Sequence, residues 1–597
     1  MNAYAVVRND RTEASDVAAL MSGRTLAGLP EEQTASLIDF FRRNKYPLIA
    51  LRGRIESVAW AQAVEADIEE CESQRHEFVL VRNAWAREGI ESIAIKSGGF
   101  YPPFPYTSDN LDVLVRREHW PKAVWILEQL GYAWLANTDE ERKILFRKFR
   151  GGVSVSAIHL HAWVGWDAEF HEEKIWHRAR CAEDDPTVTV PSREDVILIN
   201  AAHAFFENKR FSLFDLERLR RYWFHSDIDW AYIEGVAERR GWLDGLFFAL
   251  ATCAHIEREY FGRSSAPDHL VHRWETQLHR WPFVRSHYRR LTQRRPVELP
   301  FRVSFAFSKV LYYRKLLNDQ HETARRRFSS MRRTLLWGIK QKSHVNPQRS
   351  MLVTLSGLDG SGKTSHVRAL SDALTTCDVT HRVVWTRPGC SSPYRTLSAI
   401  TKLFSWRRGG ASNAERSAPR KAGPLRKLAR LAWAATNVID LTLVYTLRVR
   451  LPMLFGTVVV CDRYATDAVV ELRSRLHESD RLARWLVGLI ETLALRPRLA
   501  YLLDIAPSEA TARSADGADA DGASLRRHAY LAAAGRNGLR VRNANRAFGL
   551  ENDHIVLEVL RAYFAESGTW LNGLLLSNPR QLNEIDELFA PAQEGRP

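Results

Sequence analysis

A glycine-rich stretch at residues 356–365, SGLDGSGKTS, has the composition of a phosphate-binding loop. Its spacing fits the pattern GxxxxGK[ST], with an apolar, strand-like run before it and a helical pattern after it. In that context backbone N–H groups wrap phosphates, the lysine reaches the β- and γ-oxygens, and the threonine hydroxyl binds Mg²⁺. The alternative is a degenerate loop that binds nothing. We expect a site for ATP with Mg²⁺ formed by Gly357, Gly360, Ser361, Gly362, Lys363, Thr364 and Ser365.

A candidate metal ligand, Asp462, directly follows an apolar, strand-like run at residues 457–461. A carboxylate at the carboxyl end of a neighbouring strand can complete the Mg²⁺ shell that Thr364 begins. The next residue, Arg463, can bind a phosphate through two parallel hydrogen bonds. The alternative is an ordinary salt bridge at a strand end. Together with the loop, the pattern predicts that Thr364 and Asp462 hold the metal.

Residues 351 to about 565 resemble thymidylate kinases, which are P-loop nucleoside-monophosphate kinases. The resemblance rests on GLDGSGKT at 357–364, TRPG at 386–389, DRY at 462–464, and YLLDIAPSEATAR followed by LRRHAYL. It implies a parallel P-loop NTPase sheet with flanking helices and ATP-dependent phosphorylation of a nucleoside monophosphate. The implied catalytic residues are Lys363, Arg463, Arg387 and Asp359. Arg387 and Arg463 would face the acceptor phosphate, and Arg513, Arg526 and Arg527 would lie on the lid side.

The chain departs from that family where the acceptor would bind. The glutamate of the family's TREPG turn is missing, and Asp467 and Glu471 stand where a serine-rich step and a Tyr-Gln pair serve the thymine pocket. The expected lid, SADGADADGAS, carries no arginine. The acceptor therefore stays open between dTMP and another small phosphorylated molecule.

A different acidic pattern occurs in the first half of the chain. Gly98 and Gly99 are followed, at a distance of about ten residues, by Asn110 and Asp112. Polymerase-β-like nucleotidyltransferases use a small-residue turn followed by D-x-D on a strand, where period two places both carboxylates on one face to share two Mg²⁺ ions. A third acid would stand on a later strand, where this chain has His159.

Residues 80–255 resemble the uncharacterised nucleotidyltransferase-like family of bacteria. The resemblance implies a mixed sheet with helical additions and makes Asp112 a candidate metal ligand. Asparagine and histidine replace two of the expected acids, and Mg²⁺ prefers charged oxygen ligands. The domain is therefore interpreted as degenerate and ligand-binding, with active nucleotidyl transfer and a plain scaffold as alternatives. His159 and His161 share a strand face, so a Zn²⁺ or Mn²⁺ site is an alternative to simple packing.

The sequence predicts an α/β and α+β multidomain protein, and its length of 597 residues suggests two to four domains. Period-two patterns predict strands near 90–96, 110–116, 143–149 and 153–163. The expected domains are an N-terminal helical region at 1–80, a nucleotidyltransferase-like domain at 81–280, a basic helical linker at 281–348 and a thymidylate kinase-like P-loop domain at 349–597.

The net charge of +15 is concentrated in two segments. Residues 285–350 carry 17 Lys and Arg against 3 acidic residues, and 406–430 carry 8 against 1. Aromatic residues alternate with arginine in the first segment, so its helices either pack on a domain, lie on an anionic membrane surface or contact nucleic acid. Nucleic acid is the least favoured of these partners.

Several observations favour a cytoplasmic protein. The six cysteines form no CxxC pair, which argues against a zinc ribbon or redox motif and fits a reducing compartment. The N-terminal stretch has no apolar signal region, and no apolar run reaches about 18 residues. The expected partners are ATP and a small anionic acceptor, with a second copy of the chain as a further candidate. The predicted function is ATP-dependent phosphotransfer, and the alternatives are a non-catalytic nucleotide sensor or scaffold and an active N-terminal nucleotidyltransferase.

Overall fold

The computed structural model describes most of the chain. The described residues are 10–96, 110–135, 143–164, 172–183, 185–223, 225–293, 297–320, 323–329, 331–332, 350–388, 424–476, 479–513, 520–545 and 548–575. Several predicted features lie outside these ranges: Gly98, Gly99, Gly389, residues 406–423 of the second basic segment and lid residues 514–519.

The first half contains a mixed five-stranded sheet. Its order is β1-β2-β5-β4-β3, in which β2 and β5 run parallel and the other neighbours run antiparallel. The four predicted strand regions are confirmed as β1, β2, β4 and β5. Helix α4 (Trp120–Gln129) and the last turns of α3 (Val58–Arg87) pack their apolar side chains on this sheet. The strand bounds are β1 Ser92–Ile95, β2 Leu111–Val115, β3 Ala133–Leu135, β4 Lys143–Arg150 and β5 Val153–His161.

A large helical layer accompanies this sheet and holds the largest hydrophobic core. The N-terminal helices and the helices after β5 contribute to it. Helices α11 and α12 of the predicted basic linker also pack there, because their apolar residues are buried in that core. Arg289, Arg290 and Arg314 are exposed, whereas Lys315 of α12 is buried. The helix bounds are α1 Asp10–Met21, α2 Glu31–Arg43, α5 Glu172–Arg178, α6 Arg193–Ala202, η4 His203–Asn208, α7 Leu213–Trp223, α8 Trp230–Arg239, α9 Leu243–Phe261, α10 Asp268–Arg280, α11 Pro282–Thr292 and α12 Phe305–Asn318. The described residues of the first half also form short helical turns and two-stranded ribbons: η1 Leu48–Leu51, η3 Arg117–His119, β6 Arg180–Cys181 with β7 Thr189–Val190, and β8 Arg210–Phe211 with β9 Phe301–Arg302.

The second half is a three-layer α/β/α unit built on a parallel five-stranded sheet. The strand order is β11-β12-β10-β13-β14, so the first strand of this half is central. The side chains of β12 alternate between two cores: Val458 and Val460 face α14 and α22, whereas Val459 and Cys461 face α16, α18 and α19. Strands buried on both faces in this way are typical of parallel sheets. The bounds are β10 Leu352–Gly357, α14 Lys363–Thr376, β11 His381–Trp385, α16 Pro424–Tyr445, η6 Thr446–Arg450, α17 Leu451–Leu454, β12 Val458–Asp462, α18 Ala465–Ser474, α19 Arg481–Leu493, β13 Leu499–Asp504, α20 Pro507–Arg513, α21 Ala520–Asn537, β14 Arg540–Asn543 and α22 Phe548–Leu575.

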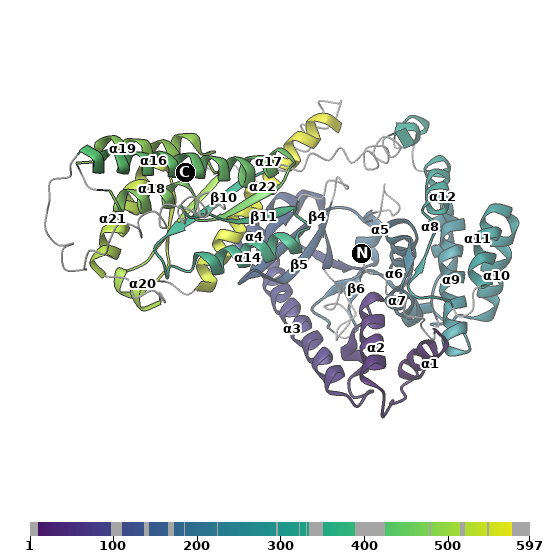
Figure 1. Ribbon diagram of the computed structural model, residues 1–597. Helices are drawn as coiled ribbons and strands as arrows, with labels where there is room; N and C mark the ends of the chain where they lie inside the picture. The colour runs from purple at the N-terminus through teal and green to yellow at the C-terminus, as the bar shows by residue number, and fades with distance from the viewer. Residues whose placement is uncertain are drawn as a thin grey trace.

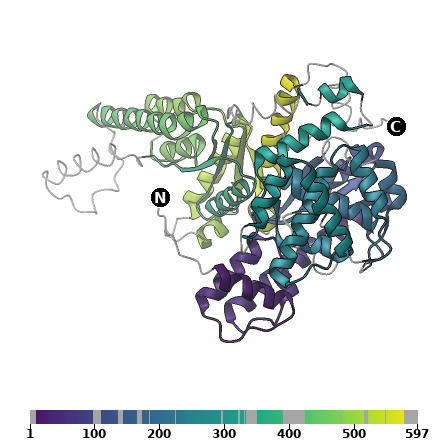
Figure 2. The ribbon, with the colours of Figure 1, turned by 90° about the vertical axis from the view of Figure 1, so that its right-hand side faces the viewer.

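The two halves lie side by side, and α14 and α22 of the second half contact the sheet of the first (Figures 1 and 2). The turn between β4 and β5 fits closely against α14. A Cβ atom on Gly152, whose φ is +89°, would lie 2.5 Å from the carbonyl oxygen of Ala369. The neighbouring Gly151 donates its N–H to Asp553 over 2.8 Å, and Arg561 donates to the carbonyls of Glu128 and Tyr132.

Among the described residues, no helix is both long and apolar enough to span a bilayer. The five cysteines within the described ranges are all free.

Candidate functional site

The glycine-rich loop connects the central strand β10 to helix α14, as the sequence predicts. We call residues 357–364 the phosphate loop. Gly360 has φ +85°, and a Cβ atom there would lie 2.5 Å from the carbonyl oxygen of Ala510. Gly362 precedes the helix in a left-handed conformation. The N-terminus of α14 therefore opens at the carboxyl end of the central strand, where its dipole and unpaired N–H groups favour an anion.

Lys363 lies in the first turn of α14 and is buried. Its ammonium donates to the carbonyl oxygens of Gly357 (2.9 Å) and Leu358 (2.6 Å), so it is folded over the phosphate loop. Burial lowers the pKa of Lys363, although the carboxylates of Asp467 and Asp462 act against this change. The ammonium is thereby held at the place where a bound phosphate would need positive charge.

Thr364 and Asp462 come together as the sequence predicts. The Thr364 hydroxyl donates to Oδ2 of Asp462 over 2.7 Å. The other oxygen, Oδ1, is buried and has no hydrogen-bond partner among the described residues. Burial raises the pKa of Asp462, against the opposing effects of the Thr364 bond and the Lys363 ammonium. An unpartnered carboxylate oxygen beside a hydroxyl fits the oxygen ligands that Mg²⁺ prefers.

The predicted acceptor-side arginines meet at one carboxylate next to the phosphate loop. Asp359 forms an ion pair with Arg463, and its other oxygen lies 3.7 Å from Arg387. Arg387 also lies 3.4 Å from Glu471 on α18. The backbone of Arg463 is left-handed, with φ +73°, which is unusual for a residue other than glycine and is often found at functional sites. Two guanidinium groups thus converge beside the loop, each matched by a carboxylate.

The three predicted lid-side arginines are held by groups of the second half. Arg513 contacts Glu509 (3.2 Å) and the carbonyl of Ala544 (3.4 Å). Arg527 forms two parallel hydrogen bonds with Asp504, and Arg526 donates to the carbonyl of Gly522. Ser365 is exposed on the first turn of α14.

Asp467 binds the start of the phosphate loop through its carboxylate. Its buried carboxylate accepts bonds from the Ser356 hydroxyl (2.6 Å), the Gly357 N–H (3.3 Å), the Tyr530 hydroxyl (3.0 Å) and the N–H of Tyr464 at the start of α18. One carboxylate therefore ties β10 to α18 and α21. From the sequence, Asp467 was interpreted only as a difference from the thymidylate kinase pattern in the acceptor pocket. Its place three residues after the helix cap was the available signal, since that is the position of a capping box.

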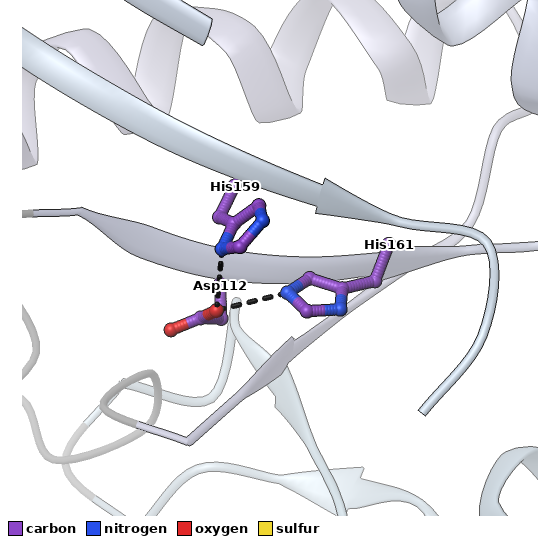
Figure 3. Close-up of side chains that lie close together, drawn as sticks. All are labelled: Asp112, His159 and His161. Atoms are coloured by element: carbon purple, nitrogen blue, oxygen red, sulfur yellow. Dashed lines mark hydrogen bonds and ion pairs between the residues drawn. The ribbon is translucent and has the colours of Figure 1, made fainter. Parts of the chain in front are cut away.

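A second group of polar side chains is buried in the sheet of the first half (Figure 3). We call Asp112, His159 and His161 the Asp–His cluster. Strands β2 and β5 pair in parallel with Asp112 opposite His159, and His161 follows on the same strand face. Oδ1 of Asp112 lies 2.8 Å from Nε2 of His161 and 3.3 Å from Nδ1 of His159. His159 thus lies directly opposite Asp112 on a later strand of the sheet.

Two lysines and a glutamate extend this group. The Lys96 ammonium lies 3.0 Å from Oδ1 of Asp112 and 3.4 Å from Glu207. Lys143, at the start of β4, lies 2.7 Å from Glu207. Glu207 belongs to the π-helical turn η4, a feature frequent at functional sites. Sequence reasoning missed these residues, because nothing in their local pattern distinguishes them.

Electrostatics divide the group into charged and neutral members. Burial opposes ionisation of Asp112, but the Lys96 ammonium and the two histidine hydrogen bonds hold its pKa well below the usual value. Burial also acts on Lys96, yet Asp112 and Glu207 prevail and raise its pKa. Burial lowers the pKa of His159, and burial together with His159 lowers the pKa of His161 to about 3. At neutral pH an ion pair therefore lies beside two neutral imidazoles.

This donor set does not fit the paired Mg²⁺ ions of nucleotidyl transfer. Among the described residues, Asp112 is the one carboxylate of the cluster, and His159 and His161 supply nitrogen. Two Mg²⁺ ions need several charged oxygens that bridge them. Asn110, directly before β2, is neutral.

Comparison with known proteins supports the resemblance of the first half. Residues 57–257 match the family described as uncharacterised nucleotidyltransferase. The match begins at the start of α3 and includes the whole mixed sheet and the helices as far as α9. No protein with a curated description matches the chain.

Proposed function

We propose that the second half of this chain is an ATP-dependent phosphotransferase of the thymidylate kinase-like type, whose acceptor is a nucleoside monophosphate such as dTMP or a related small phosphorylated molecule. The observation that carries the proposal is the arrangement of Lys363, Thr364 and Asp462 at the N-terminus of α14. A positive charge and a hydroxyl converge there with a buried carboxylate oxygen that has no partner within the described part of the chain.

Phosphoryl transfer depends mainly on positioning and on stabilisation of charge, so this arrangement suits it. The helix N-terminus and Lys363 would bind the triphosphate oxygens. Thr364 and Asp462 would hold Mg²⁺, which neutralises charge on the β- and γ-phosphates when it is bound. The burial of Lys363 strengthens its interaction with an anion, because less water competes for the ammonium.

The acceptor side is expected to be anionic. Arg387 and Arg463 meet at Asp359, and a phosphorylated acceptor could take over these guanidinium groups from the carboxylate. Asp359 would then have two roles. It positions both arginines before a ligand binds, and it excludes ligands that bind guanidinium groups more weakly than a carboxylate does. Asp467 has a supporting role, since its oxygens are used in bonds to the fold.

A second candidate function is nucleotidyl transfer in the first half, and the family match favours it. The relation of Asp112 to His159 across β2 and β5 follows the geometry of that class. The composition of the cluster argues against it, because one carboxylate already paired with Lys96 replaces several acids. A non-catalytic sensor, in which both halves bind nucleotide without turnover, is a further alternative.

The test of the main proposal is ATP consumption by the full chain with Mg²⁺ and a panel of nucleoside monophosphates that includes dTMP. Lys363→Ala should lower turnover by roughly a hundredfold or more, the order of loss caused by removing one donor to developing charge. Lys340→Ala, in the basic segment, provides a control of equal charge change. Binding of ATP with no turnover of any acceptor would favour the sensor.

A further inference from the structure

We propose that Asp112, His159 and His161 form a binding site for a single transition-metal ion of the Zn²⁺ type, in place of the paired Mg²⁺ ions of nucleotidyl transfer. This site lies in the first half of the chain and is independent of the phosphotransfer proposed for the second half. Figure 3 shows both imidazoles directed at the same carboxylate oxygen.

The ligand atoms are already close to the required geometry. One oxygen of Asp112 and one nitrogen of each histidine lie within 4.8 Å of one another. Zinc–ligand distances of about 2.0–2.2 Å place neighbouring tetrahedral ligands about 3.3 Å apart. The observed separations from Oδ1 of Asp112 are 3.3 Å to His159, which equals that value, and 2.8 Å to His161, which is somewhat shorter. Small side-chain rotations would therefore open room for an ion.

The backbone holds the ligands in place before any ion binds. Asp112 and His159 are direct neighbours across two strands in the interior of the sheet, and His161 is fixed by the period of β5. All three side chains are buried. The other ring nitrogen of His159, Nε2, is buried without a partner among the described residues. A preformed ligand set on rigid strands binds an ion without the cost of ordering a loop.

The donor types select the class of ion. Imidazole nitrogen suits Zn²⁺, Co²⁺ and related ions, whereas Mg²⁺ prefers oxygen and retains its water. Two histidines and one carboxylate are also the ligands of several catalytic zinc sites, which keep an open position for water or a substrate oxygen. The cluster therefore offers three protein ligands and one free position.

Lys96 is the local competitor of the ion. Its ammonium lies 3.0 Å from the Asp112 oxygen that the metal would use. Glu207 forms ion pairs with both Lys96 and Lys143. Lys96 therefore retains an anionic partner when the metal coordinates Asp112. The ammonium should weaken metal binding by charge repulsion without preventing it. Replacing Lys96 by a neutral side chain of similar length should tighten binding.

The experiment is a titration of the tag-free, chelator-treated full chain with Co²⁺ as a spectroscopic probe, followed by competition with Zn²⁺ and with Mg²⁺. We expect stoichiometric binding with visible absorption bands of low-symmetry Co²⁺, displacement by Zn²⁺ and none by Mg²⁺. His159→Gln and His161→Gln should each weaken Co²⁺ binding at least tenfold, and Lys96→Met should strengthen it.

His272→Gln is the matched control, because His272 is an exposed histidine on α10 of the same half and does not belong to the cluster, so its variant should bind Co²⁺ as the unchanged chain does. Circular dichroism checks that each variant is folded. Absence of Co²⁺ bands in the unchanged chain would overturn the proposal, whatever the variants do. Appearance of the bands only in Lys96→Met would also overturn it, since Lys96 would then be the permanent cation of the cluster.

Discussion

At the scale of single residues, the candidate site of the second half contains a carboxylate whose two oxygens have different surroundings. Asp462 uses one oxygen for Thr364 and leaves the other buried without a partner among the described residues. A buried polar atom without a hydrogen-bond partner destabilises the folded state unless a ligand binds to it. We therefore propose that this oxygen belongs to the metal shell rather than to the fold.

Replacing Asp462 by Asn tests this assignment. The amide keeps the size of the side chain but removes the charge that attracts Mg²⁺, so ATP turnover at saturating Mg²⁺ should fall by roughly a hundredfold. The affinity for ATP measured without Mg²⁺ should change little. Asp372→Asn, at an exposed position of α14, is the control and should leave both quantities unchanged. Equal turnover in Asp462→Asn and the unchanged chain would remove Asp462 from the metal site.

His203 gives a prediction about pH. Burial, Lys96 and Arg218 lower its pKa to about 3, while Glu207 and Asp215 act in the opposite sense. An unfolded histidine titrates near pH 6.5, so between about pH 6.5 and pH 3 the unfolded chain binds the proton more readily. The neutral histidine thus favours the folded state above pH 6.5, and this contribution is lost as the pH falls.

The measurement is the free energy of unfolding in urea at pH 7 and pH 5. The loss of stability over this interval should be smaller in His203→Gln than in the unchanged chain, because glutamine does not titrate. An equal loss in both proteins would show that His203 is not a source of the pH dependence.

At the scale of elements, Asp467 fastens three of them together. Its carboxylate joins β10, α18 and α21. Asp467→Asn should therefore destabilise the fold by about 3 kcal/mol or more, since buried donors lose a charged acceptor. Glu471→Gln, one helical turn further along α18, removes a more exposed ion pair and should cost under about 1 kcal/mol. Urea unfolding of both variants measures the difference, and equal stability would contradict the supporting role.

The same scale shows what could be predicted from the sequence. Alternating residues at 110–116 and 153–163 located β2 and β5 and placed Asp112 near His159, because strand period fixes which side chains share a face. The phosphate loop was predictable because its glycines have a local conformational cause. Lys96 and Glu207 were not predictable, since their meeting depends on how a turn and a helix 111 residues apart pack. The capping position of Asp467 could be read from the local sequence, but its bond to Tyr530 could not, because that contact is tertiary.

At the scale of the whole molecule, the two halves share a hydrophobic core. Ala133 and Phe149 of the first sheet belong to the same cluster as the residues of α14 and α22. The helix that begins at the phosphate loop therefore rests on the hairpin whose second strand carries His159 and His161 (Figure 1).

Two adjacent glycines test this contact. Gly152→Ala would place a methyl group against the backbone of Ala369, whereas Gly151→Ala meets no atom within 4 Å. Both positions have positive φ, +59° at Gly151 and +89° at Gly152, so alanine strains the backbone in both variants, and Gly152→Ala adds the clash with Ala369. We expect Gly152→Ala to be less stable than Gly151→Ala by about 2 kcal/mol, the typical cost of overpacking. Calorimetric unfolding of both variants measures this, and identical curves would argue against close docking of the two halves.

The most direct test of the central claim is the fate of the label when the full chain acts on ATP radiolabelled at either the α- or the γ-phosphate. We expect the γ-phosphate to move to the acceptor and ADP to form. Lys363→Ala should abolish this transfer, and Asp112→Asn should leave it intact. Transfer of the α-label with release of pyrophosphate, lost in Asp112→Asn and retained in Lys363→Ala, would contradict the account and assign the chemistry to the first half.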